Sequence, residues 1–141
     1  MTGAARLRAA DLAVGQVREA VVVESLSRTQ IVMYAGASGD FNPIHHDEEF
    51  ATRAAGYPSV FAHGMLSMGL TGRLLTDWLG DGVLREFGVR FVRQVWPGDT
   101  LTAKGTVTSI GPDGRVAIEL VTTNQRGEPV VAGDAVAVLP A

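Results

Sequence analysis

The sequence predicts an α+β fold in which an antiparallel five-stranded sheet wraps around a long central helix. Three observations support this prediction. A short β-branched segment is followed by helical stretches, the longest stretch is apolar around most of its surface, and from residue 84 apolar residues recur at every second position. A sheet around a helix buries both apolar surfaces in one core. The 141 residues are expected to form one domain, 1–141.

The first two predicted elements are a strand and a helix. Residues 16–26 (QVREAVVVESL) are β-branched and short, which is typical of a strand. Residues 27–39 open with Ser27, and Gln30 follows three positions later, which is the capping-box pattern of a helix start. One face of this helix is then apolar and consists of Ile31, Tyr34 and Ala35.

A short helix is predicted next. Asp47 can cap it, because an aspartate side chain accepts hydrogen bonds from the first backbone amides of a helix. Glu48 and Glu49 then lie in the first turn, where the helix dipole favours negative charge. Gly56 and Pro58 end the helix.

Residues 63–80 (HGMLSMGLTGRLLTDWLG) carry the strongest helical pattern. Two apolar rows leave little polar surface, so this helix is expected to be mostly buried. Met65 and Met68 belong to the first row, and their periodicity favours the core for both side chains, although on the wall of a tunnel they would also line a pocket.

The last part of the chain is predicted as four strands joined by tight turns. The turn sequences are PGD (97–99), GPDG (111–114) and RGEP (126–129). Three short turns between four strands indicate an antiparallel meander, in which each strand pairs with the next. The strand around Val89 is expected at an edge of the sheet, so we expect a dimer that covers this edge.

Composition and charge exclude several classes of function. The formal net charge is −3 and no cluster of Lys and Arg is interleaved with aromatic residues, so no nucleic-acid partner is expected. The chain has no Cys, which excludes disulfides, thiolate nucleophiles and cysteine-bound metals. No N-terminal apolar core suits a signal peptide, and no apolar run approaches the ~20 residues that cross a bilayer. A cytoplasmic protein without a membrane partner is expected.

The segment SGDFNPIHHD (38–47) concentrates ionisable residues between two helical stretches. One interpretation is a polar helix stop, because its glycine can terminate a helix and Asp40 and Asn42 can satisfy nearby backbone amides. The other is a site. Asp40 and His45 can both transfer protons, and the rigid Pro43 between them would hold the two side chains at a fixed separation.

A second feature, AHGM (62–65), places Gly64 in the first turn of the long helix. Free N–H groups at the positive end of a helix dipole form an anion or oxyanion site. A proton-transfer pair and an oxyanion donor, without a nucleophilic Cys or a Ser–His elbow, indicate addition or elimination at a polarised carbonyl compound.

These residues resemble the signature of the MaoC-like dehydratases. The resemblance rests on YAGASGDFNPIHHDEEFA (34–51) and AHGM (62–65), and FGVRFVRQVWPGDTLTAKGTV (87–107) is similar to the family's second and third strands. It therefore covers nearly the whole chain. The family contains (R)-specific enoyl-CoA hydratases and (3R)-hydroxyacyl-ACP dehydratases. The resemblance implies the hot-dog fold, with an active site in a tunnel at a dimer interface.

The resemblance also implies roles for individual residues. Asp40 and His45 match the pair that holds and activates a water, and Gly64 matches the glycine whose N–H polarises the thioester carbonyl. The implied reaction is the reversible syn hydration of a trans-2-enoyl thioester to a (3R)-3-hydroxyacyl thioester, in fatty-acid or related acyl metabolism. The substrate partner is an acyl-CoA or an acyl-ACP. No cofactor and no metal is expected.

Four neighbouring residues are assigned supporting or neutral positions. Ser38 and Asn42 are expected to pin the loop, and His63 is expected to fix the segment that aims Gly64. His46 directly follows His45 and is expected to face solvent.

Three alternatives stay open. A hot-dog acyl thioesterase shares the scaffold but normally lacks this Asp–His motif. The chain could also be a subunit of a heterodimeric dehydratase that is inactive without its related partner, although a homodimer is expected. A metal site formed by His45, Asp47 and His63 is disfavoured, because nothing organises a fourth ligand. The substrate's phosphates could meet any of five arginines, at positions 53, 73, 85, 90 and 93.

Overall fold

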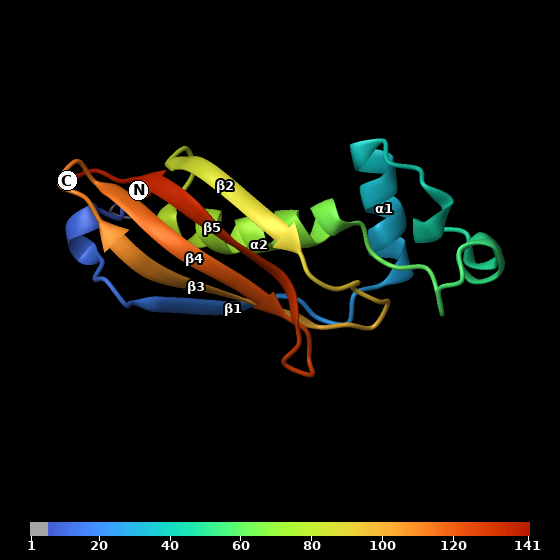
Figure 1. Cartoon of the computed structure of the whole chain (residues 1–141). Helices are drawn as coiled ribbons and strands as arrows, with labels where there is room; N and C mark the ends of the chain where they lie inside the picture. The colour runs from blue at the N-terminus through green and yellow to red at the C-terminus, as the bar shows by residue number, and fades with distance from the viewer. Residues whose placement is uncertain (1–5) are drawn as a thin grey trace.

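The structure is a computed structural model that describes residues 6–141, and its elements follow the predicted order. The elements are η1 (Ala9–Asp11), β1 (Val17–Val23), α1 (Arg28–Ser38), η2 (Pro43–His45), η3 (Phe50–Ala54), α2 (Gly64–Leu79), β2 (Leu84–Phe91), β3 (Leu101–Ile110), β4 (Arg115–Thr123) and β5 (Pro129–Val138). The five-stranded antiparallel sheet lies over α2, and α1 and the short helices after it gather at one end (Figure 1). The predicted fold class is confirmed.

The start of α1 follows its predicted capping box. The Ser27 hydroxyl accepts a hydrogen bond from the Gln30 backbone amide at 3.0 Å, and the Gln30 side chain accepts one from the Ser27 amide at 2.9 Å. Gly39 ends the helix in the left-handed conformation, with φ of 75°. The helix is anchored by Ile31 and Ala35, which are buried, so the chain leaves α1 at a fixed point and direction.

The sheet has the strand order β1-β3-β4-β5-β2, which corrects the predicted four-strand meander. Strands β3, β4 and β5 do pair in succession, but β2 pairs with β5 and not with β3. The PGD turn is not a hairpin turn. Its Gly98 amide donates to the Leu26 carbonyl at 2.7 Å, and its Asp99 carbonyl accepts from the Leu26 amide at 2.8 Å. These bonds fasten the turn to the β1–α1 connection, at the opposite edge from β2.

The segment between β2 and β3 (92–100) therefore crosses from one side of the sheet to the other. On its way it passes the start of α2, where the Ala62 amide donates to the Val95 carbonyl at 2.8 Å. This crossing brings the end of β2, the start of α2 and the loop after α1 together at one end of the molecule.

Helix α2 packs against the concave face of the sheet. Its Leu74, Leu75 and Leu79 side chains are buried against strand residues, among which Leu101, Val107, Ile118, Leu120 and Ala135 are at most 1% exposed. One stripe of the helix faces outward, at positions 65, 69, 73 and 77. The prediction that Met65 belongs to the core is wrong, because Met65 lies on this stripe and is 55% exposed. Met68 is half-buried.

Strands β1 and β2 form the two edges of the sheet, so the prediction of an edge around Val89 is confirmed. Among the helices of residues 6–141, none has both the length and the apolar character that a membrane span needs.

Candidate active site

The loop after α1 is held by a series of short side-chain to backbone hydrogen bonds. The Ser38 hydroxyl accepts from the Asp40 amide, an Asp40 carboxylate oxygen accepts from the Asn42 amide, and the Asn42 side chain accepts from the Ile44 amide, each at 3.2 Å. These contacts support the expectation that Ser38 and Asn42 pin the loop. Asp40 contributes only its Oδ1 atom to these hydrogen bonds, which leaves Oδ2 available to a ligand.

His45 is the last residue of η2, a 3₁₀ helix of one turn that begins at Pro43 and is capped by Asn42. Its side chain is 7% exposed, and Nδ1 lies 2.6 Å from the Phe61 carbonyl oxygen. Because a carbonyl oxygen can only accept, the ring proton of the neutral imidazole lies on Nδ1. Nε2 is therefore left with its lone pair and can accept a proton.

His63 connects the loop to the start of α2. It is the N-cap residue of that helix and is 2% exposed. Its Nε2 donates to the Asp40 carbonyl oxygen at 3.1 Å, and its ring stacks on His45 with centroids 3.8 Å apart and an interplanar angle of 26°. Tyr34 of α1 meets it edge to face at 4.8 Å. These contacts support the expected role of His63, which is to fix the segment before Gly64.

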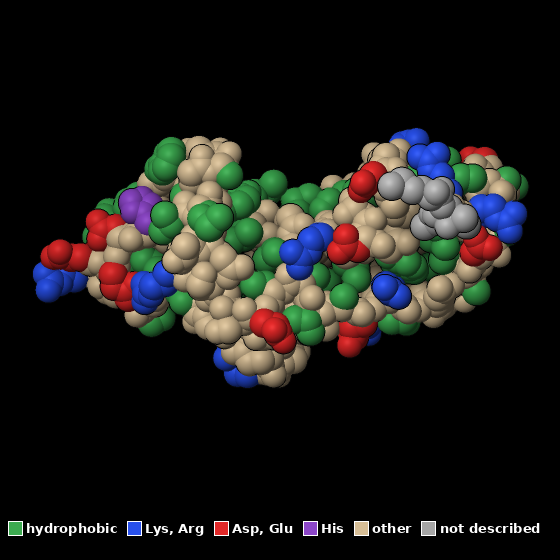
Figure 2. Space-filling view, turned by 180° about the vertical axis from the view of Figure 1, so that it is seen from behind, with side chains coloured by type: hydrophobic (Ala, Val, Ile, Leu, Met, Phe, Trp, Pro, Cys, Tyr) green, Lys and Arg blue, Asp and Glu red, His purple; other side chains and the backbone are tan. Residues whose placement is uncertain are grey.

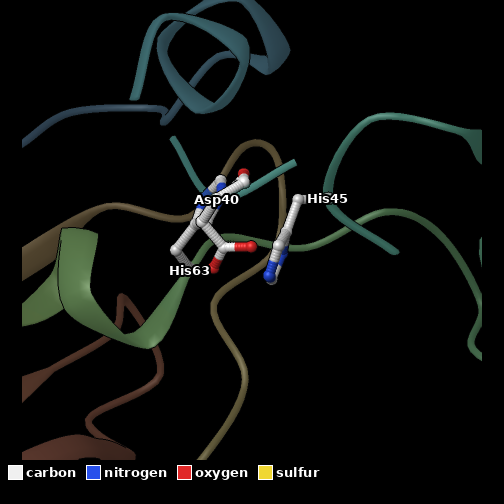
Figure 3. A group of neighbouring side chains, drawn as sticks. All are labelled: Asp40, His45 and His63. Atoms are coloured by element: carbon white, nitrogen blue, oxygen red, sulfur yellow. Dashed lines mark hydrogen bonds between the residues drawn. The ribbon is translucent and has the colours of Figure 1, made fainter. Parts of the chain in front are cut away.

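Asp40, His45 and His63 converge from the loop after α1, from η2 and from the start of α2 (Figure 3). One ligand atom from each residue lies within 4.8 Å of the others, a spacing that could also suit a metal ion. The cluster contains Asp40 and not Asp47, which was part of the metal site that the sequence disfavoured. Asp47 instead accepts a hydrogen bond from the Phe50 amide at 3.0 Å and caps the following turn.

The surroundings of His45 disfavour its charged form. Burial lowers the pKa of His45 below its ordinary value, and the neighbouring His63 and His46 act in the same direction, whereas the Phe61 carbonyl and the Asp40 carboxylate oppose them. A neutral imidazole beside an exposed carboxylate can accept one hydrogen bond from a water while the carboxylate accepts the other. His46 is exposed as predicted, and its ring contacts the Phe41 carbonyl at 3.1 Å.

Helix α2 offers unpaired amides beside this cluster. The first amides of the helix with a partner are those of Leu66 and Ser67, which both donate to the His63 carbonyl. The N–H groups of Gly64 and Met65 have no acceptor within residues 6–141. A larger residue at position 64 would displace the Phe91 ring, because a Cβ there would lie 2.7 Å from it. The ring of Phe91 thus covers the backbone of Gly64 directly.

A cleft of about 230 Å³ opens between the start of α2 and the segment after β2. Its lining is mainly apolar and includes Gly64, Phe61, Ser67, Phe91, Val95 and Val131. Arg93 is the only one of the five arginines considered above that lines it. Arg53 pairs with Glu49, Arg73 donates to the Val22 carbonyl and Arg85 donates to the Gly82 carbonyl.

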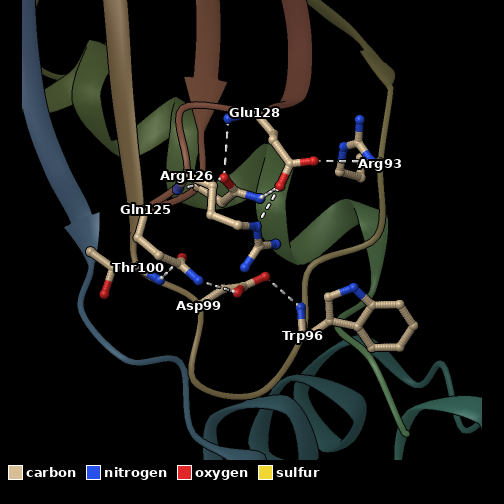
Figure 4. Close-up of polar contacts among 8 residues, drawn as sticks. Arg93, Trp96, Asp99, Thr100, Gln125, Arg126 and Glu128 are labelled. Atoms are coloured by element: carbon tan, nitrogen blue, oxygen red, sulfur yellow. Dashed lines mark hydrogen bonds and ion pairs between the residues drawn. The ribbon is translucent and has the colours of Figure 1, made fainter. Parts of the chain in front are cut away.

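The wall of the cleft is fastened by a polar network at the end of the sheet (Figure 4). Asp99 is only 4% exposed and accepts hydrogen bonds from the Trp96 amide at 2.9 Å and from the Gln125 side chain at 2.8 Å. Glu128 pairs with both Arg93 and Arg126. These bonds tie the segment 92–100 to the β4–β5 turn.

Three participants were not anticipated from the sequence. The Phe61 carbonyl, which fixes the His45 tautomer, is a backbone group and has no sequence signature. Phe91 belongs to the alternating apolar pattern after residue 84, but its contact with Gly64 depends on the strand order. Ser67 lies three residues after Gly64, so helical spacing alone could have placed it on the same face.

The comparisons with known proteins agree with this geometry. Residues 9–137 match the family described as MaoC like domain. The (R)-specific enoyl-CoA hydratase of Rhodospirillum rubrum is 33% identical over 133 residues, which are 93% of this chain and 90% of that protein. The 3-hydroxyacyl-thioester dehydratase Y of Mycobacterium tuberculosis is 44% identical over 68 residues, which are 46% of this chain but only 23% of that longer protein.

Among solved structures, the unliganded R-hydratase PhaJ1 of Pseudomonas aeruginosa superimposes with a TM-score of 0.86 and 32% identity, covering 96% of this chain and 86% of that one. The hot-dog fold implied by the sequence is confirmed.

Proposed function

The chain belongs to the family of MaoC-like domains, and on this premise we propose that it is a hydro-lyase acting on acyl thioesters. It adds water to a trans-2-enoyl thioester to give a (3R)-3-hydroxyacyl thioester, and it catalyses the reverse dehydration. The observation that carries the proposal is the position of Asp40 and His45. Both contact His63, the residue before Gly64, and the unpaired Gly64 N–H group borders an apolar cleft.

The proposed mechanism assigns one task to each group. A water donates its two hydrogen bonds to Asp40 and to Nε2 of His45, whose Nδ1 is held by the Phe61 carbonyl. His45 takes one proton as the water oxygen attacks C3 of the substrate, and the same proton is then delivered to C2 from the same face. The net change is addition of H and OH across the double bond. The negative charge that develops on the thioester oxygen meets the Gly64 N–H, a fixed donor that needs no reorganisation.

We also propose that the chain works as a homodimer, with a heterodimer with a related subunit as the alternative. The support is an apolar surface around the site: Phe41, Met65, Phe91 and Val92 are each 49–64% exposed. Figure 2, which views the molecule from the α2 side, shows hydrophobic side chains in a hollow between its two ends. An edge strand, β2, adjoins this surface. Light scattering at micromolar concentration should give a dimer mass, and a monomer mass would contradict the assignment.

Activity of the purified chain on trans-2-enoyl-CoA substrates of increasing length tests the reaction. The expected product is the (3R)-3-hydroxyacyl-CoA, identified by chiral chromatography, with Asp40→Asn as the inactive control. The release of free thiol, followed in the same assay, tests the thioesterase alternative. Comparison of one acyl chain on CoA and on ACP identifies the preferred carrier. An inactive wild type that gains activity with an added related subunit would identify the heterodimeric form. A cytoplasmic location stays a prediction, which cell fractionation can check.

A further inference from the structure

Ser67 presents a hydroxyl group to the cleft that no group within residues 6–141 uses. The residue is 3% exposed, and its hydroxyl has no hydrogen-bond partner within residues 6–141. In the same residues, His63 Nδ1 is the only fully enclosed side-chain nitrogen or oxygen that lacks a partner. The Ser67 hydroxyl is therefore not sealed in the core. Since Ser67 lines the cleft, its hydroxyl is open to whatever fills that space.

The next hydroxyl along the same face of α2 behaves differently. The Thr71 hydroxyl donates to the Ser67 carbonyl at 2.9 Å and accepts from the Thr122 hydroxyl at 2.7 Å. Both threonines are completely buried. Thr71 thus has all its hydrogen bonds inside the protein, as buried polar groups normally do. The Ser67 hydroxyl lacks such a partner where α2 lines the cleft, which indicates that a ligand supplies it.

The direction of the Ser67 side chain identifies the part of the ligand that it meets. Residues three apart on a helix share a face, so Ser67 lies on the same side of α2 as Gly64. Side chains of an α-helix also lean toward its N-terminus, which turns the Ser67 hydroxyl toward the Gly64 turn. Gly64, Ser67 and Phe91 all line the cleft, and the Phe91 ring lies against Gly64.

We infer that the Ser67 hydroxyl donates a second hydrogen bond to the thioester carbonyl oxygen, next to the Gly64 N–H. The inference rests on the proposed function, because it needs a substrate whose carbonyl oxygen gains negative charge during the reaction. Two donors on this oxygen bind the enolate-like state more strongly than the ground-state carbonyl. Ser67 is therefore a catalytic residue whose loss lowers kcat more than it raises KM.

The test compares Ser67→Ala, Ser67→Thr and Thr71→Val with the wild type, by kcat and KM on a short trans-2-enoyl-CoA and by thermal unfolding. Ser67→Ala should lose about 10²-fold in kcat, as expected for one oxyanion donor, with little change in KM or Tm. Ser67→Thr keeps the hydroxyl and should keep most of the activity. Thr71→Val breaks bonds inside the protein, so it should lower Tm and leave the kcat of the folded enzyme near the wild-type value.

Two results would overturn the role of Ser67 and leave the proposed function standing. In the first, the wild type is active and the Ser67→Ala variant is equally active. In the second, Ser67→Ala loses kcat together with Tm, and Ser67→Thr does not restore the activity. A wild type without activity on any enoyl thioester, alone or with a related subunit, would overturn the proposed function and the role of Ser67 together.

Discussion

Nδ1 of His45 donates a hydrogen bond to the Phe61 carbonyl oxygen at 2.6 Å, and the two aromatic rings meet edge to face with centroids 5.3 Å apart. The hydrogen bond sets the tautomer, and the ring contact limits the orientation of the imidazole. A base whose lone pair is already aimed loses less entropy when it reaches the transition state. The backbone of residue 61 is therefore as much a part of the site as the side chains beside it.

Asp40→Asn and His45→Ala should each reduce hydration of an enoyl-CoA by about 10²–10⁴-fold, the usual contribution of a general acid or base. The two groups are proposed to hold one water, so the double variant should lose far less than the product of the two single losses. Steady-state kinetics on the three variants measures this, with circular dichroism and light scattering to show that fold and assembly are kept.

His46→Ala is the matched control for His45→Ala, because His46 is exposed and should be replaceable with little effect on the rate. His63→Ala should give an intermediate rate, since it removes the bond to the Asp40 carbonyl but no proposed proton carrier. Near-wild-type turnover of Asp40→Asn would favour the interpretation of the loop as a polar helix stop.

The rate should fall as the pH is lowered, with an apparent pKa below the ordinary histidine value of 6.5. Burial lowers the pKa of His45, so the ring stays neutral and able to accept a proton until the solution is moderately acidic. A profile of kcat/KM against pH measures this. An acid limb centred above 6.5 would contradict the environment described for His45.

The free energy of unfolding should also depend on the protonation of His45, and it should decrease as the pH falls. Above pH 6.5 neither the folded nor the unfolded chain binds this proton. As the pH falls below 6.5, the unfolded chain binds it first, so the free energy of unfolding decreases until the folded pKa is passed. Urea titrations at several pH values should show this loss, and His45→Ala should remove it. The hydrogen bond from Arg126 is the main reason why the pKa of the Glu128 carboxylate is lowered. Glu128 therefore affects the free energy of unfolding only below pH 4.5.

Gly64→Ala should disturb both stability and activity, because the new Cβ would lie 2.7 Å from the Phe91 ring. Overpacking of this kind typically costs about 1–3 kcal/mol. The double variant Gly64→Ala/Phe91→Ala removes the clash and should recover much of the lost Tm. If Gly64→Ala alone were as stable and active as the wild type, Phe91 could not cover the helix start as described. Gly72→Ala is a useful comparison, since its Cβ would approach a ring carbon of Phe87 only to 3.0 Å.

Asp99→Ala should lower the free energy of unfolding by about 1–3 kcal/mol. The substitution leaves the Trp96 amide without its carboxylate partner at a position that is almost completely buried. It should also raise KM, since the segment 92–100 forms one wall of the cleft. Chemical denaturation and enoyl-CoA kinetics give the two values. Arg53→Ala breaks an ion pair with Glu49 in which both side chains are largely exposed, so its effect should be within about 0.5 kcal/mol.

Activity should persist after treatment with a chelator, because the carboxylate and the imidazole can activate water without a Lewis acid. The experiment also tests a metal-dependent alternative, because the ligand atoms of Asp40, His45 and His63 lie within 4.8 Å of one another and could hold a metal ion. The assay is enoyl-CoA hydration before and after chelation and dialysis. Loss of activity that one specific divalent ion restores would replace the proposed mechanism by a metal-assisted one.

The sequence predicts this molecule best where the cause is local. The Ser27–Gln30 capping box and the Asp47 cap need only neighbouring residues, and both form as expected. The motif between residues 38 and 47 also indicates a loop held by its own short polar side chains, and these hydrogen bonds form. The catalytic role of Asp40 and His45 stays a prediction.

The errors concern long-range partners. Alternation of apolar residues shows which face of β2 is inward but not which strand it pairs with, and the PGD turn bonds to Leu26 across the fold. Met65 is apolar and in phase with Met68, yet it lies on the outward stripe of α2. The same limit applies to His45, because the sequence indicates a reactive histidine without naming the carbonyl that orients it.

The hydrogen bond from His63 to the Asp40 carbonyl also determines whether the site can be transferred to another protein. A protein engineer who grafted residues 38–47 onto another hot-dog scaffold would carry over both proton-transfer groups. The graft would lack the partners at Phe61 and His63, which lie 16 and 23 residues away along the chain. A functional transplant therefore has to be discontinuous and must include the start of the recipient's central helix.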